Sequence, residues 1–176
     1  MTANDIVAWH DFFVMAGGGA AALIGLLFVA LSINLHHVMG TPGVTSRAAT
    51  FLIGLVTILF SSAVALIPDQ SPRTFGIELL IIGFIGIALD GMFRRRFMQP
   101  TEFLSRGHNQ VVRYVLLTGA TIPAWIASIS LLEGWPRALD WLALSYAFLL
   151  YGGISGSWIL LVELPLWVAR NKSDGR

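Results

Sequence analysis

The chain has 176 residues, of which 56% are hydrophobic and only 12% are charged. Soluble domains are nearer a quarter charged, and a chain this short and apolar cannot cover a soluble core with polar surface. The composition therefore predicts an integral membrane protein. The chain has no cysteine, which excludes disulfides, thiolate metal sites and cysteine nucleophiles.

The apolar residues gather in stretches long enough to cross a bilayer, which takes about 20 residues of helix. Backbone groups in hydrocarbon must be satisfied within the segment, so each stretch is predicted to be a helix. The fold class expected is an all-α polytopic membrane protein, a five-helix transmembrane bundle that forms one membrane domain over residues 1–176. The predicted spans are residues 12–35, 47–67, 75–93, 111–132 and 141–168.

The links between these stretches carry turn and cap residues. The sequence "GTPG" at 40–43 predicts a turn before the second helix. Ser71 is expected to cap the third helix, with Pro72 at its first position, where a missing N–H costs nothing.

Basic residues divide unequally between the two sides of a five-span chain. Nine of the eleven Lys and Arg residues fall on the side of the C-terminus and two, Arg73 and Arg137, on the side of the N-terminus. Basic residues near span ends stay cytoplasmic, so the N-terminus is expected outside and the C-terminus inside. The same bias argues against insertion in both orientations.

The link between the third and fourth spans is the most basic segment. Residues 100–106 are expected to form a short interfacial helix, opened by Pro100. The segment is either a docking or lipid-sensing element or, as favoured here, an orientation anchor. In both interpretations anionic lipids at the cytoplasmic face meet the four arginines Arg94, Arg95, Arg96 and Arg106.

Small residues align on one side of two predicted helices. Gly18, Gly25 and Ser32 share a face of the first span, and Gly152, Gly153 and Gly156 share a region of the last. Small residues at such spacing allow another helix to approach closely. Packing within the chain is the favoured interpretation, and homo-oligomerisation is the alternative.

Acidic residues inside the spans are the best signal for a site, because charge in hydrocarbon is costly. Asp90 and Glu163 lie near the inner ends of two spans, and Arg113 opens the fourth at the same depth. Together with residues that follow the first span they predict a polar cluster, either a structural ion-pair cluster, as favoured here, or a proton, ion or substrate site. The candidate members are Asn34, His36, His37, Asp90, Arg113 and Glu163.

Motifs for catalysis are missing from the sequence. There is no P-loop, Rossmann glycine pattern, HExxH or G-x-S-x-G motif, so no catalytic, cofactor-binding or metal-binding residue is assigned, and no cofactor or nucleic-acid partner is expected. The first-helix sequence "GAAALIGLLFVALSINL" resembles that of small, uncharacterised multi-span proteins of the bacterial inner membrane. The resemblance covers about the first 35 residues and implies a bacterial cytoplasmic membrane but no chemistry.

The function expected is that of a non-enzymatic membrane interaction protein. It would be an accessory subunit of a larger membrane complex, with other membrane subunits as partners, or a small homo-oligomer. The alternative is a small channel or a proton- or ion-coupled transporter that uses Asp90, Glu163 and Arg113, with the kink expected at Pro123.

Overall fold

The computed structural model describes residues 3–33, 42–97, 107–163 and 166. Within these ranges it leaves out the side chains of residues 3–5, 42–47, 94, 96–97, 107–118, 160 and 163. The described part is all-α, as predicted, with six α-helices and no strand. The helices are α1 (Ala3–Ala8), α2 (His10–Ile33), α4 (Pro42–Ala65), α5 (Pro72–Phe97), α6 (Gly107–Glu133) and α7 (Ala138–Trp158), and a π-helix, η2 (Ile159–Glu163), follows α7.

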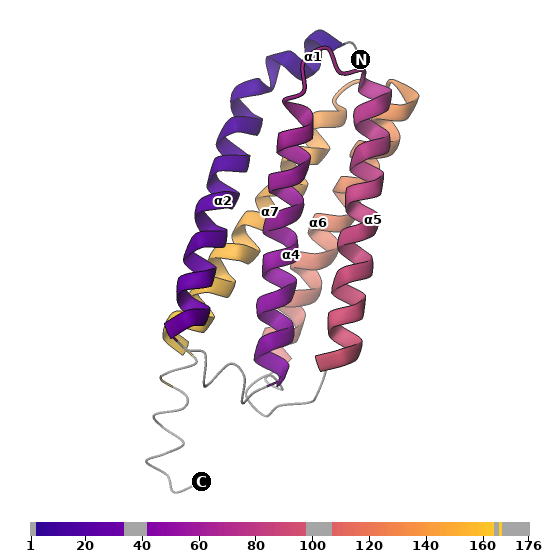
Figure 1. Ribbon diagram of the computed structural model, residues 1–176. Coiled ribbons are helices and arrows are strands. Elements are labelled where there is room, and N and C mark those ends of the chain that lie inside the picture. The colour runs from indigo at the N-terminus through magenta and orange to yellow at the C-terminus, as the bar shows by residue number, and fades with distance from the viewer. Residues whose placement is uncertain (1–2, 34–41, 98–106, 164–165, 167–176) are drawn as a thin grey trace, which may run out of the picture.

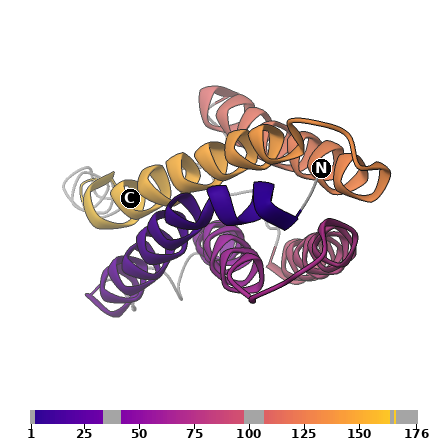
Figure 2. The ribbon, with the colours of Figure 1, turned by 90° about the horizontal axis from the view of Figure 1, so that it is seen from above.

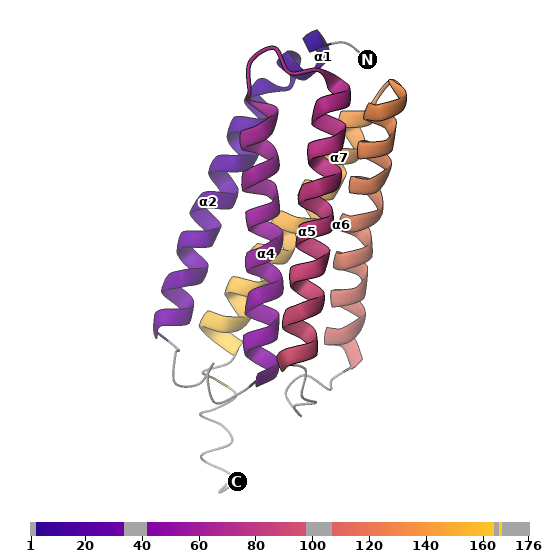
Figure 3. The same cartoon turned by 45° about the vertical axis from the view of Figure 1, so that its right-hand side comes forward.

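The five long helices run up and down alongside one another (Figure 1). Seen from above they form two layers, with α2, α4 and α5 in one and α6 and α7 in the other (Figure 2). Helix α7 runs obliquely across the first layer and packs against both α4 and α2. The connections from α4 to α5 and from α6 to α7 lie at the end of the bundle that carries α1 (Figure 3).

Four of the long helices are long and apolar enough to cross a membrane, as in a multi-pass membrane protein. They are α2, α4, α5 and α7, with spanning segments His10–Ile33, Ala48–Ala65, Pro72–Phe93 and Ala138–Trp158. These segments match four of the five predicted spans. Helix α6 covers the predicted fourth span but is not among the four, so the fifth span stays a prediction.

Two helix boundaries differ from expectation. The turn predicted at 40–43 is wrong for residues 42 and 43, because α4 already begins at Pro42. The fixed φ of proline suits the first position of a helix. In the predicted last span, α-helical geometry ends at Trp158 and changes to π over Ile159–Glu163. Pro165 has no N–H to offer to the carbonyl of Leu161, so the sequence removes one i→i−4 hydrogen bond of an α-helix at this point. The predicted interfacial helix over 100–106 lies outside the described residues.

The predicted cap of the third helix is confirmed. The Thr74 N–H donates to Ser71 Oγ at 3.1 Å, and α5 begins at Pro72. At the end of α6, Gly134 takes a positive φ of 72°, which an L side chain rarely adopts. The Trp135 N–H then donates to the Ser130 carbonyl at 2.8 Å, which closes the turn into α7.

An aromatic cluster holds α2, α5 and α7 together near the α1 end. The rings of Phe12 and Tyr146 stack with centroids 5.8 Å apart, and Phe13 meets Phe75 edge to face at 5.9 Å. Phe13, Phe75 and Tyr146 are buried. This packed end leaves a less filled region between α4, α5, α6 and α7.

Candidate functional site

A cavity of about 750 Å³ lies inside the bundle, lined by residues of α4, α5, α6 and α7. Most of its wall is aliphatic, with Leu79 and Ile82 from α5 and Leu142 and Leu149 from α7. Small organic ligands bind in largely apolar cavities of about 300 to 1,000 Å³ that carry a few polar groups. The size and lining of this cavity fit that class.

Glycines of α5 create the space. A Cβ atom added at Gly83 would meet nothing within 4 Å, whereas one added at Gly86 would lie 3.1 Å from Thr57 Oγ1 of α4. Gly86 therefore lets α4 and α5 approach closely, while one turn away Gly83 leaves the cavity open.

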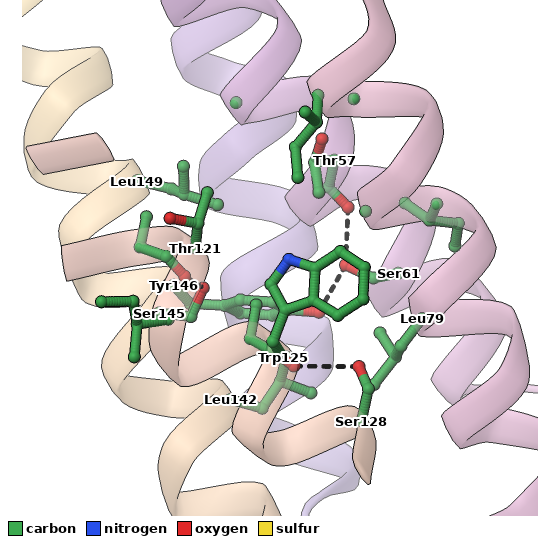
Figure 4. A pocket seen from close by; sticks show the side chains of 18 of the residues that line it. Thr57, Ser61, Leu79, Thr121, Trp125, Ser128, Leu142, Ser145, Tyr146 and Leu149 are labelled. Atoms are coloured by element: carbon green, nitrogen blue, oxygen red, sulfur yellow. Dashed lines mark hydrogen bonds between the residues drawn. The ribbon is translucent and has the colours of Figure 1, made fainter. Parts of the chain in front are cut away.

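Hydroxyl groups line the middle of the cavity (Figure 4). Ser61 of α4 donates to the Thr57 carbonyl at 2.6 Å, and its oxygen lies 2.6 Å from the Tyr146 hydroxyl of α7. A serine has one hydroxyl proton, so Tyr146 is the donor of this pair. On the α6 side, Ser128 donates to the Ala124 carbonyl at 2.9 Å and Ser145 of α7 to the Ala120 carbonyl at 2.7 Å.

Asp90 places a carboxyl group in the lining of the cavity. It lies on α5, three residues before the end of the spanning segment Pro72–Phe93. Thr50 of α4 donates its hydroxyl proton to Asp90 Oδ1 at 2.5 Å. This hydrogen bond between two partly buried side chains ties α4 to α5 beside the cavity.

Asp90 is the member of the predicted polar cluster whose side chain the structure describes. Asn34, His36 and His37 lie outside the described residues. Arg113 and Glu163 belong to α6 and η2, but their side chains also lie outside the description. A meeting of the six residues therefore stays a prediction, and Thr50 is the partner that the structure adds.

The other acid of α5, Glu78, lies near the opposite end of the helix. Gln70, in the link before α5, donates its side-chain N–H to Glu78 Oε2. This pair holds the link against the helix. Glu78 does not line the cavity, so Asp90 is the acid of the candidate site among the side chains that the structure describes.

The two small-residue faces have different surroundings. Gly152, Gly153 and Gly156 of α7 are buried, and a Cβ added at Gly153 would lie 2.7 Å from Leu55 Cδ2 of α4. Packing within the chain is thus confirmed for the α7 face. The prediction of packing within the chain is wrong for the α2 face. Gly18, Gly25 and Ser32 are exposed, and a Cβ added at either glycine would meet nothing within 4 Å. Helix α2 instead packs with Phe13, Ala16, Ala20 and Leu27, because hydrophobic residues on every side allow either face to turn inward.

Of the predicted lipid-contacting arginines, Arg95 is exposed near the end of α5, as a headgroup contact requires. The side chains of Arg94 and Arg96, and the whole of Arg106, lie outside the description.

Several lining residues were not singled out from the sequence. Thr50, Thr57 and Ser61 are seven and four residues apart, which places them on one face of α4, and this spacing is a signal that the sequence carries. Trp125 and Tyr146 carry no such signal, because aromatic residues are common throughout the chain. Within the part of the chain that the structure describes, no three His, Asp or Glu side chains are placed to share a metal ion.

Comparisons with protein-family models, with curated proteins and with solved structures found no match to this chain.

Proposed function

We propose that this chain is a membrane transport protein whose solute site is the cavity between α4, α5, α6 and α7. The observation that carries the proposal is a carboxyl group, Asp90, lining a cavity of about 750 Å³ inside a bundle of apolar helices. Ionisable groups within spans are costly and mark ion and substrate pathways or proton relays. A coupled carrier needs both a cavity and a group that can exchange a proton or bind a cation. We propose no chemical conversion of the solute.

The membrane arrangement proposed with it has five spans in the bacterial cytoplasmic membrane. The N-terminus lies on the outer side and the C-terminus on the cytoplasmic side. The long helix α6 runs between the two ends of the bundle as a fifth span would (Figure 1). The nine-to-two division of the eleven basic residues supports the orientation. In this arrangement Asp90 lies in the cytoplasmic half, where anionic lipids would meet the basic end of α5.

Replacing Asp90 by asparagine is expected to slow transport while leaving the fold intact. The test uses the full chain in lipid vesicles that contain a pH-sensitive dye, with proton entry driven by an imposed potential. The protein-dependent rate should fall at least about tenfold, because the change removes a charge-assisted interaction of about 1.5 to 3 kcal/mol.

The matched control is Asp69→Asn, which makes the same chemical change at an exposed link position with a positive φ that asparagine tolerates. It should transport at the rate of the unmodified chain. Equal rates for Asp90→Asn and the unmodified chain, or no protein-dependent flux at all, would contradict the proposal.

A second candidate function is that of an accessory subunit or a small homo-oligomer. The observation that favours it is the outward position of Gly18, Gly25 and Ser32 on α2, where another membrane helix can approach closely. Native mass spectrometry in mild detergent should then show a larger species, and Gly25→Leu should reduce it without unfolding the chain. Detection of the chain only as a monomer, with no co-purifying subunit, would contradict this candidate.

A further inference from the structure

The cavity opens sideways between α5 and α6. Four apolar residues of its lining are also 40 to 56% exposed on the outside of the bundle, namely Ile87 of α5 and Ile122, Trp125 and Ile129 of α6. Closer to the α1 end the two helices touch, since a Cβ at Gly76 would lie 3.0 Å from Leu131 Cβ. In a bundle that crosses a bilayer, an opening framed by outward apolar side chains faces hydrocarbon, so the cavity is open to lipid chains.

Glycines of α5 form the floor of this opening. Gly83 and Gly91 line the cavity, and a Cβ added at either would meet nothing within 4 Å. Ile87 lies between them, one turn from each, so the three positions follow one face of the helix. Because the two glycines carry no side chain, this face is a groove that runs along α5.

The length of the groove matches one leaflet of a bilayer. The lining of α5 runs from Leu79 to Gly91, which is 91 − 79 = 12 residues and about 18 Å of helix at 1.5 Å per residue. The hydrocarbon of one leaflet is about 15 Å thick, half of the whole core. Gly91 lies two residues before Phe93, where the spanning segment ends. The groove therefore starts near the membrane surface and reaches the middle of the bilayer.

The polar groups of the wall are bonded within the protein. Thr50 and Asp90 bond to each other. Hydroxyl protons go to backbone carbonyls at Thr57, Ser61, Ser128 and Ser145. Trp125 adds an N–H donor, but its side chain lies at the exposed edge of the opening, so a chain in the groove does not have to enclose this donor. An alkyl chain therefore breaks none of these hydrogen bonds when it enters.

A basic side chain stands just beyond the groove. Arg95 follows Gly91 by one turn, which continues the same face of α5, and it is exposed. It lies two residues past the end of the spanning segment at Phe93, at the depth of the lipid headgroups. An arginine at this place can donate charge-assisted hydrogen bonds to a phosphate group, and its positive charge favours lipids with a net negative charge.

We propose that the cavity binds one anionic phospholipid, with an acyl chain in the groove between α5 and α6 and its phosphate beside Arg95. The lipid belongs to the leaflet in which α5 ends, which is the cytoplasmic leaflet in the membrane arrangement proposed above. This inference rests on the proposed function, since it assigns a ligand class to the same cavity.

Trp125 lies where the far end of the acyl chain is expected. It precedes Leu131, the neighbour of Gly76, by 131 − 125 = 6 residues, which is about 9 Å of helix. Because α5 and α6 are neighbours that run in opposite directions, this distance brings Trp125 to the level of Gly83 (Figure 1).

The experiment measures quenching of Trp125 fluorescence by a phospholipid that carries bromine near the end of one acyl chain, since bromine quenches indole on contact. The full chain is held in nanodiscs of an unbrominated zwitterionic lipid, and the brominated lipid is added at a low mole fraction. The quenching that is lost in Trp125→Phe belongs to the cavity, and the other five tryptophans supply the background. An anionic probe should quench Trp125 at a lower mole fraction than a zwitterionic probe with the same brominated chain.

Two substitutions fill the groove, and a third is the control. Gly83→Leu and Gly91→Leu should each abolish the Trp125-dependent quenching by the anionic probe at low mole fraction, because leucine occupies the space of the acyl chain without a clash at Cβ. The two glycines are two turns apart, so a folding defect in one variant leaves the other as a test. Gly19→Leu makes the same change on α2, where a Cβ also meets nothing within 4 Å, and should leave quenching unchanged.

The head group has its own pair of variants. Arg95→Gln should raise the mole fraction of the anionic probe that gives half of the quenching by about fivefold, the effect of one basic residue near anionic lipid, and should not affect the zwitterionic probe. Arg73→Gln makes the same change at an exposed position at the other end of α5 and should have no effect on either probe.

Unchanged quenching in both Gly83→Leu and Gly91→Leu would overturn the assignment of the groove. Equal quenching by the anionic and zwitterionic probes, or equal effects of Arg95→Gln and Arg73→Gln, would overturn the head group. The two proposals fail separately. Lipid binding without proton flux would contradict the transport function and leave the lipid site in place, whereas Asp90-dependent flux without lipid binding would do the reverse.

Discussion

Replacing Gly156 by leucine is expected to separate α7 from α4 and to destabilise the bundle by about 3 kcal/mol or more, the upper end for overpacking. A Cβ at this position would overlap Cδ2 of Phe51 and lie 2.5 Å from its Cγ. These atoms belong to the rigid ring and its root, so the contact cannot be relieved by moving the end of a flexible chain. Phe51 packs against the core formed by Leu27, Ala30 and Ala48 and has little room to retreat.

The midpoint of thermal unfolding in mild detergent, followed by near-ultraviolet circular dichroism, measures the loss. Gly19→Leu is the matched control, because a Cβ added at Gly19 meets nothing within 4 Å and this position is not part of the outward face of Gly18, Gly25 and Ser32. It should unfold at the temperature of the unmodified chain or slightly above it, since leucine favours helix over glycine. If both variants unfolded at the same temperature, the close approach of α7 to α4 at Gly156 would be wrong.

Truncating Tyr146 to alanine is expected to cost about 3 kcal/mol of stability, the lower end for removing a buried aromatic ring. The ring is 2% exposed and contacts Phe12 and Phe13 of α2 at the packed end of the bundle. The lower end applies because lipid tails are as apolar as the core, so lost packing contacts dominate over transfer from water.

Tyr146→Phe separates the hydroxyl from the ring. It keeps the aromatic contacts and removes the donor to Ser61 Oγ, so about 1 kcal/mol should be lost. Adding Ser61→Ala to Tyr146→Phe should cost less than Ser61→Ala does alone, because the two groups share one hydrogen bond. Equal losses in the phenylalanine and alanine variants of Tyr146 would contradict the role given to its ring.

The candidate site was predictable in part. Asp90 stands out in the sequence because a charge within an apolar helix is costly, whatever surrounds it. Thr50, Thr57 and Ser61 could have been aligned with it from their helical spacing alone. Nothing in the sequence tells that Gly83 borders empty space while Gly86 lies against Thr57, because the neighbour of a glycine is set by another helix.

The sequence by itself determined the class of the protein and the approximate limits of its helices. Length and apolar content are properties of one segment at a time, and a bilayer requires about 20 residues of helix wherever they occur. The cap at Ser71 and Pro72 is local in the same way.

Only the tertiary structure decided which side of each helix faces inward. In a soluble protein the polar face points to water and identifies the core face, but both the lipid and the core of this bundle are apolar. The small-residue faces of α2 and α7 look alike in sequence, yet Gly18 and Gly25 point outward and Gly153 and Gly156 pack against α4. The fit of side chains such as Leu55 and Phe51 against glycine decides which face of a helix turns inward. This fit depends on a pair of helices, so the sequence of one segment cannot specify it.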